Sequence, residues 1–202
     1  MNLKTKNAWL KRRYFELLKQ ARGFSEPTIL VHELAISRWE EFTKSEDFGR
    51  LTAKKAVVFK KHLEETGVGE KPLSPSTRYR TLKCLQSFFE WLAAQPGYRS
   101  KITTDSISYL SLDRRTVAGI GSLRVPRFPG LEHVKRLADS IEIKTDIDRR
   151  DRALIAFLLL SGMRDRAVAT LPLGFFDPAT LEIRQDSLKG VDTKFGKAFT
   201  SH

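Results

Sequence analysis

A continuous apolar segment in the second half of the chain constrains its fold most strongly. Residues 153–160 are eight apolar residues in a row, which is too short to cross a bilayer and too continuous for a half-exposed surface helix. Thr145 and Asp148 have the spacing of a capping box just upstream, and Ser161-Gly162 supplies a C-cap just downstream. The pattern predicts a helix between these two signals that is buried on most sides.

Arg164 lies two residues beyond the glycine that ends this helix. Because a buried helix fixes the backbone there, the guanidinium has a rigid mount, which suits recognition of two phosphate oxygens by a planar fork of donors. The alternative interpretation is structural, since Arg164 could cap the helix carbonyls or pair with Asp165 at the surface. Short motifs also match by chance, so this window alone leaves both interpretations open.

Two segments around Arg164 form a recognisable motif. Residues 158–164 read Leu-Leu-Leu-Ser-Gly-Met-Arg, and residues 169–173 read Ala-Thr-Leu-Pro-Leu. Together they resemble the first catalytic box of the tyrosine recombinases, the phage integrase family. The resemblance implies that Arg164 binds a DNA phosphodiester. Ser161 stands where Thr is commoner, and Ala167 stands where many members carry a Glu that orients the arginine.

The charge of the chain points to a polyanionic partner. The net charge is +12 and the pI is near 10, with the excess concentrated in residues 1–112, where 20 Lys and Arg oppose 12 acids. Anionic lipid or ribosomal RNA fits the charge as well as DNA does, so charge gives only the class of partner. No run of residues is long enough for a membrane span.

Cysteine content and the N-terminal composition indicate a cytoplasmic protein. Cys84 is the single cysteine, which excludes internal disulfides and argues against a Cys-based metal site. It lies in an apolar helix pattern and is expected in the core. Met1 to Arg13 lacks the apolar block of a signal peptide. We expect no cofactor and no metal.

The first half of the chain predicts a helical bundle. Helices are expected over residues 7–20, from a cap at Ser25, over 52–65, from a cap at Ser74 to Pro96-Gly97, and over 104–112. The third and fourth helices carry basic residues that are candidates for phosphate contacts, with a solvated charged face as the alternative: Lys54, Lys55, Lys60, Lys61, Arg78, Arg80 and Lys83. The aromatic residues of the fourth helix are expected in the core.

This bundle, with its long fourth helix and basic face, resembles the core-binding domain of the tyrosine recombinases, which clamps one face of duplex DNA. Residues 113–129, rich in Gly, Pro and Arg, have the composition of an exposed linker. In the family the linker follows DNA, which implies phosphate contacts for Arg114, Arg115, Arg124 and Arg127. A solubilising tether is the alternative.

Residues 130–202 are predicted to form the first part of an α+β catalytic domain with a small antiparallel sheet. A short helix follows Gly130, residues 174–184 read as two strands around a Pro turn, and residues 191–199 read as a further strand and a hairpin turn. The resemblance implies a catalytic lysine in this hairpin, either Lys194 or Lys197, that protonates the leaving oxygen. An undocked surface lysine is the alternative.

The family reaction also needs a tyrosine nucleophile and a His-x-x-Arg box after Arg164. All four tyrosines, Tyr14, Tyr79, Tyr98 and Tyr109, precede Arg164, and His202 is the last residue. The expectation is a truncated catalytic domain that does not cleave DNA alone. Its apolar residues should then stay partly uncovered: Leu154, Phe157, Leu158, Leu171, Phe175 and Phe176.

Two functional hypotheses follow from the sequence. The first is a DNA-binding site-specific tyrosine recombinase or integrase of a mobile genetic element, shortened at its C-terminus, with a mainly α fold in which a four- to five-helix SAM-like bundle precedes the incomplete catalytic domain. Its partners would be double-stranded DNA and other recombinase protomers. The second is a non-enzymatic basic helical adaptor or regulator that binds DNA or an acidic protein through its basic bundle.

Overall fold

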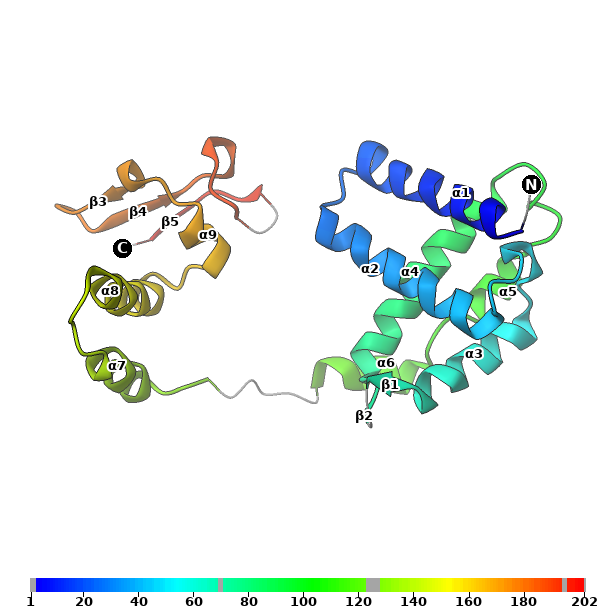
Figure 1. Cartoon of the computed structure of the whole chain (residues 1–202), viewed down its shortest axis with the longest axis horizontal. Helices are drawn as coiled ribbons and strands as arrows, with labels where there is room; N and C mark the ends of the chain where they lie inside the picture. The colour runs from blue at the N-terminus through cyan, green and yellow to red at the C-terminus, as the bar shows by residue number, and fades with distance from the viewer. Residues whose placement is uncertain (1–2, 69–70, 123–127, 194–195, 202) are drawn as a thin grey trace. The chain divides into compact units, whose positions relative to one another are not determined.

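The structure is a computed structural model that describes residues 3–68, 71–122, 128–193 and 196–201. The chain divides into two compact units, Met1–Val125 (unit 1) and Pro126–His202 (unit 2). Figure 1 shows the elements of each unit in chain order. Among the described residues, every helix is too short or too polar to cross a bilayer.

Unit 1 is a helical bundle with one very short hairpin. Its elements are α1 (Leu3–Glu16), a π-helical turn (Leu17–Ala21), α2 (Glu26–Thr43), a 3-10 turn (Phe48–Arg50), α3 (Ala53–Glu65), β1 (Gly67–Val68), β2 (Lys71–Pro72), α4 (Pro75–Ala93), α5 (Thr104–Ser108) and α6 (Arg114–Ser122). The predicted helical bundle is therefore present, with a first helix that begins earlier than expected.

Side-chain caps set the starts of several of these helices. Thr52 Oγ1 accepts the Lys55 N–H at 3.2 Å, and Ser74 Oγ accepts the Thr77 N–H at 3.2 Å, which satisfies donors that have no partner inside the helix. Both starts were predicted. Ser25 precedes α2 as predicted, but its hydroxyl makes no cap bond to the backbone and lies 3.1 Å from the Thr28 hydroxyl.

The core of unit 1 is built on the crossing of α2 and α4, which Figure 1 shows. Trp39 of α2 meets Phe89 of α4 edge-on at 5.3 Å between ring centres, and it meets Phe59 of α3 at 4.9 Å. Phe88 joins Phe48 from the preceding connection at 4.9 Å. Phe88 and Phe89 of the fourth helix are therefore core residues, as expected, and Cys84 is buried as well, whereas Tyr79 is only half-buried.

Part of the predicted linker is a helix. Residues 114–122 form α6, which contacts α4. Asp113 caps this helix, since its carboxylate accepts the Thr116 N–H at 2.9 Å and the Thr116 hydroxyl at 2.6 Å. This cap and the contact with α4 outweigh the low helix propensity of the two glycines in the segment.

Unit 2 combines three helices with a small sheet. Its elements are α7 (Leu131–Ser140), α8 (Asp146–Ser161), α9 (Asp165–Ala169), a 3-10 turn (Leu173–Phe175), β3 (Phe176–Asp177), β4 (Glu182–Gln185), a 3-10 turn (Ser187–Lys189) and β5 (Phe199–Ser201). The strands form an antiparallel sheet in the order β3-β4-β5, with Phe176 opposite Ile183 and Ile183 opposite Ser201. The small antiparallel sheet was predicted.

Helix α8 has the predicted ends but not the predicted burial. Thr145 and Asp148 form a capping box, and Gly162 adopts a left-handed C-cap with φ +59°. None of its residues is buried, and Leu154 and Leu160 are 40% and 81% exposed. The prediction of a helix buried on most sides was wrong, because only α7 and a few residues of the sheet region cover it.

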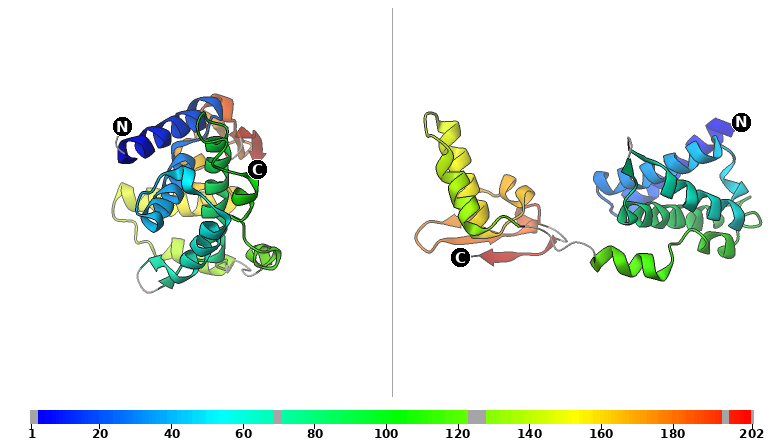
Figure 2. Two further views of the ribbon diagram at one scale, coloured as in Figure 1. Left: turned by 90° about the vertical axis from the view of Figure 1, so that its right-hand side faces the viewer. Right: turned by 90° about the horizontal axis from the view of Figure 1, so that it is seen from below.

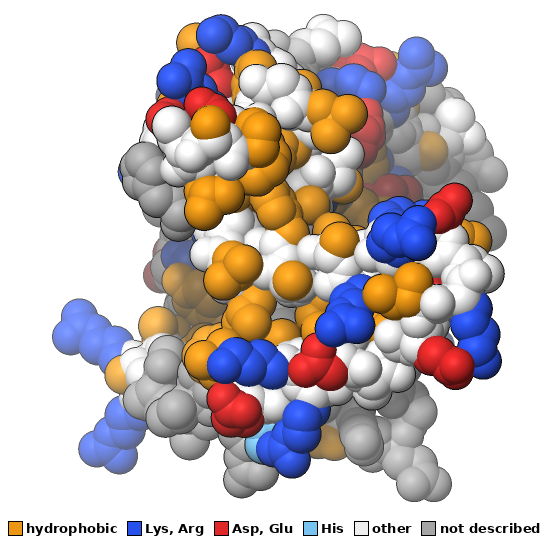
Figure 3. Space-filling model, turned by 90° about the vertical axis from the view of Figure 1, so that its left-hand side faces the viewer, with side chains coloured by type: hydrophobic (Ala, Val, Ile, Leu, Met, Phe, Trp, Pro, Cys, Tyr) orange, Lys and Arg blue, Asp and Glu red, His pale blue; other side chains and the backbone are white. Residues whose placement is uncertain are grey.

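The uncovered apolar side chains of unit 2 gather on one face, which Figure 3 shows in orange. The six residues expected to stay partly uncovered are indeed exposed or half-buried. Helices α7 and α8 run side by side in Figure 2. The buried apolar cluster of the unit consists of Met163, Ala167, Ile183 and Val191.

The chain after β4 does not form the predicted strand. Residues 191–193 and 196–198 are irregular, and β5 begins only at Phe199. Gly190 and Gly196 have φ values of +96° and +62°, which turn the chain, and Ser187 Oγ donates to the Gly196 carbonyl at 2.7 Å. These turns and this hydrogen bond take the place of the β-strand pairing that was predicted here.

Candidate nucleic-acid interface

The lysines of α3 divide into two groups. Lys54 and Lys61 are exposed and lie seven residues apart on one face of the helix, and Lys61 has only a loose pairing with Glu65 at 3.8 Å. Lys55 forms an ion pair with Glu46, and Lys60 Nζ donates to the Ser111 carbonyl at 3.1 Å. Lys55 and Lys60 therefore tie α3 to its neighbours, and Lys54 and Lys61 remain available to a ligand.

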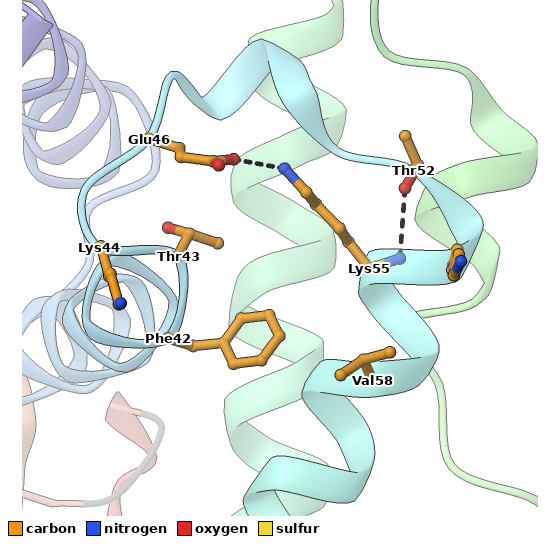
Figure 4. Close-up of a pocket in the computed structure, with 8 residues that line it drawn as sticks. Phe42, Thr43, Lys44, Glu46, Thr52, Lys55 and Val58 are labelled. Carbon is orange, nitrogen blue, oxygen red and sulfur yellow. Dashed lines mark hydrogen bonds and ion pairs between the residues drawn. The ribbon is translucent and has the colours of Figure 1, made fainter.

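A hollow of about 480 Å³ lies between the end of α2 and the start of α3. Figure 4 shows Phe42 and Val58 on its apolar side, with Lys44 and Lys55 near its edge. Lys54 also lines it. Lysines around an apolar surface can neutralise a phosphate while a sugar packs on the surface. Sequence reasoning missed Lys44, which ends α2 in a left-handed conformation with φ +53°.

The basic residues of α4 also differ in their surroundings. Arg78 donates to Glu64 at 2.6 Å and only 15% of its side chain is exposed, so it joins α4 to α3. Arg80 and Lys83 are exposed, and the Lys83 ammonium lies 5.9 Å from the centre of the Tyr79 ring. Arg80 and Lys83 are therefore better placed than Arg78 to contact a phosphate.

The arginines of the predicted linker are only partly described. Arg114 and Arg115 lie exposed in the first turn of α6. Arg124 and Arg127 lie outside the described residues. Two of the four candidates thus belong to a helix that contacts α4.

A polar cluster lies where α1, α2 and α4 meet. We call Tyr14, Arg22, His32, Arg80 and Ser87 the Arg22 cluster. The Tyr14 hydroxyl lies 3.1 Å from His32 Nδ1, and Arg22 Nη1 donates to Ser87 Oγ at 3.1 Å. Arg22 was missed by sequence reasoning, because the only local signal is a basic residue before the Gly23 that ends the first helix.

Burial and the two arginines shift the pKa values of Tyr14 and His32 in this cluster. Burial raises the pKa of Tyr14 to about 12, and Ser87 and Arg22 act in the opposite direction. Burial also lowers the pKa of His32 below its ordinary value of 6.5, and the positive charges of Arg22 and Arg80 lower this pKa further. The charges of Arg22 and Arg80 therefore both act on the same buried imidazole.

Arg164 in unit 2 stands at a fixed backbone position. It is the N-cap residue of α9, between buried Met163 and a helix whose Ala167 is also buried. Its side chain is exposed, and among the described residues neither a helix carbonyl nor Asp165 binds its guanidinium. Among the described residues, Arg164 therefore makes neither of the contacts that a purely structural role would require, and its guanidinium is available to a ligand.

The candidate lysines of unit 2 are less defined. Lys197 is exposed, and its carbonyl accepts the Thr193 hydroxyl at 2.7 Å. Lys194 lies outside the described residues. Among the described residues no group of three or more His, Cys, Asp or Glu side chains could hold a metal ion.

A family comparison identifies the helical bundle. Residues 12–96 match the family of the phage integrase N-terminal SAM-like domain, a segment that begins within α1 and ends just after α4. This segment is a phage integrase SAM-like, core-binding domain, a domain of the tyrosine recombinase family. A comparison with curated proteins found no match. Unit 2 lies outside the matched segment, and DNA is the partner that a core-binding domain implies.

Proposed function

We propose that the chain takes part in site-specific DNA recombination or integration and that unit 1 binds the double-stranded DNA. The observation that supports this most strongly is a basic surface on an integrase core-binding domain, in which Lys54, Lys61, Arg80 and Lys83 are exposed. Phosphate contacts of this kind position a protein on DNA without reading its sequence. Arg114 and Arg115 add two further exposed basic residues, in the first turn of α6.

Binding to duplex DNA over a series of salt concentrations tests this proposal. Each phosphate contact contributes about 0.9 to the slope of log K against log salt, so replacing Lys54, Arg80 and Lys83 together by Glu should remove roughly three units of slope. The loss should be equal on unrelated DNA sequences. Arg99→Glu is the matched control, since Arg99 is exposed beyond the other end of α4. Equal effects of the control and the triple variant would show that the proposed surface is wrong.

We further propose that Arg164 binds a DNA phosphodiester and that Lys197 or Lys194 serves proton transfer in the same unit. The fixed backbone and free guanidinium of Arg164 support its role, because a fork held at its base loses little freedom on binding two oxygens. Replacing Arg164 by Ala in the full chain should lower the salt slope by about 0.9, and Lys should restore charge but not bidentate binding.

A non-enzymatic DNA-binding adaptor is the second candidate. The family match favours it in so far as residues 12–96 belong to a DNA-binding domain, which supports binding by unit 1 and does not bear on catalysis by unit 2. If the chain is such an adaptor, its affinity for DNA should depend on Arg80 and Lys83 and should be unchanged by Arg164→Ala at every salt concentration.

A further inference from the structure

The Arg22 cluster has the construction of a binding site at the surface of unit 1. Tyr14 is fully buried and His32 is 7% exposed, and together they form a buried polar floor, whereas Arg22 and Arg80, whose charges act on His32, are exposed. Tyr14 also stacks edge-on against Phe88 at 5.2 Å between ring centres, so the core fixes the floor. A rigid floor of this kind holds the residues above it in place.

The backbone of Arg22 is fixed by an unusual end to the first helix. The Arg22 N–H donates to the Leu17 carbonyl five residues earlier, at 3.1 Å, which closes the π-helical turn. Gly23 follows with φ +63°, and the Phe24 N–H donates to the Leu18 carbonyl at 3.0 Å. Local π-helical turns occur frequently at functional sites.

The side chain of Arg22 is fixed as well. Ser87 Oγ accepts one of its N–H groups at 3.1 Å, and the other N–H groups of the exposed guanidinium remain for a ligand. Arg80 precedes Ser87 by seven residues, which is about two turns of α4 and the same side of the helix. The two arginines therefore flank one strip of α4.

Two other titratable groups of α4 lie near the floor. Cys84 is buried and has a raised pKa, because burial disfavours the thiolate, so it stays neutral. Glu90 acts on Tyr14 by raising the pKa of its hydroxyl, and it follows Ser87 by three residues, on the side away from Arg80. The two arginines therefore outnumber the single carboxylate along this side of α4.

We propose that Arg22, held by Ser87, and Arg80 form a seat for a backbone phosphate of DNA at the junction of α1, α2 and α4. This inference rests on the proposed DNA binding of unit 1 and assigns a place and a geometry to it. The phosphate oxygens accept from both guanidinium groups, and Ser87 reduces the side-chain freedom that Arg22 loses on binding. Arg22 is a binding residue, and Ser87 is a positioning residue.

Four single variants of the full chain test the seat by affinity for a duplex over a series of salt concentrations. Arg22→Gln and Arg80→Gln should each lower the slope of log K against log salt by about 0.9. Ser87→Ala should leave the slope unchanged and weaken binding about two- to tenfold, because Arg22 keeps its charge but must be ordered by the ligand. Arg99→Gln, the matched control outside the seat, should change neither slope nor affinity. Tryptophan fluorescence verifies that each variant is folded.

The His32 imidazole provides a second readout, followed by NMR titration with and without DNA. A phosphate between the arginines offsets their positive charge, so DNA should raise the pKa of His32. Suppose that the wild-type chain binds DNA and that Arg80→Gln weakens binding. The seat is then refuted if Arg22→Gln binds like the Arg99→Gln control and DNA leaves the pKa of His32 unchanged. Absence of salt-dependent DNA binding by wild-type chain overturns the proposed function itself, and the seat with it.

Discussion

The two units differ in how completely their helices cover one another. In unit 1, α2, α3 and α4 enclose one continuous apolar core that includes Trp39, Phe59 and Phe88. In unit 2, the buried apolar cluster is confined to four residues, and α8 has no buried residue at all. A helix pattern and a good cap therefore specify a helix, whereas its burial depends on segments from elsewhere in the chain that pack against it.

A matched pair of core truncations gives the sharpest test of this difference. Phe88→Ala removes a fully buried ring and should destabilise unit 1 by about 3–5 kcal/mol. Phe157→Ala removes a half-buried ring of α8 and should leave the unfolding of unit 1 unchanged. Tryptophan fluorescence in urea measures the effect on unit 1 alone, because Trp9, Trp39 and Trp91 all lie there. Equal shifts for both variants would mean that the units unfold as one.

Removing a helix cap should destabilise the protein less than truncating a core residue, and the two units can be compared in this way as well. Ser74→Ala removes the cap of α4 and should destabilise unit 1 by about 1 kcal/mol, measured by the same urea transition. Thr145→Ala removes the capping box of α8 and should raise amide exchange along α8, because little tertiary burial holds that helix. Unchanged exchange in α8 would show that unit 2 is held more firmly than its core suggests.

Acidification should weaken unit 1 through His32. The pKa of His32 is lowered in the folded chain, chiefly by burial, so the unfolded chain takes up the proton more readily. Stability is therefore full above the ordinary pKa of 6.5 and decreases as pH falls through 6.5 toward the lower folded value. Urea transitions between pH 7.5 and 5.5 measure this loss. His62→Gln should retain the pH dependence, and His32→Gln should abolish it.

The smallest expected effect concerns an exposed ion pair. Arg12 and Glu16 pair at 3.0 Å on α1, one turn apart, and both side chains are exposed. Arg12→Ala should change the stability of unit 1 by less than about 0.5 kcal/mol. A larger shift in the urea transition would show that the surface of α1 contributes more than its exposure indicates.

The starts of α3, α4 and α8 could be predicted from the sequence, because Thr52, Ser74 and Thr145 bond to backbone groups within three residues. The roles of Lys55 and Arg78 could not be predicted, because only the fold brings each of them close to its ion-pair partner. Lys55 pairs with Glu46, and Arg78 pairs with Glu64. The exposure of Leu160 was missed for the same reason: its apolar neighbours in the sequence say nothing about what covers it.

The candidate site was predicted only in part. Arg80, Lys83 and Arg164 were identified from basic residues on helical patterns and from one motif, and all three are exposed. Arg22 was not, because its position depends on a π-helical turn and on Ser87, which is 65 positions further along the chain. Neither contact leaves a periodic signal in the sequence.

The π-helical turn Leu17–Ala21 holds one residue more than an ordinary α-helical winding of similar height. Because the wide turn absorbs the extra residue, deleting the exposed Gln20 should restore an α-helical turn while the backbone on either side keeps its orientation around the helix axis. Leu10 and Tyr14 then stay in the core, and Arg22 stays on the side of α4. The chain can therefore tolerate a change of length by one residue at this point without losing the contact between Arg22 and Ser87.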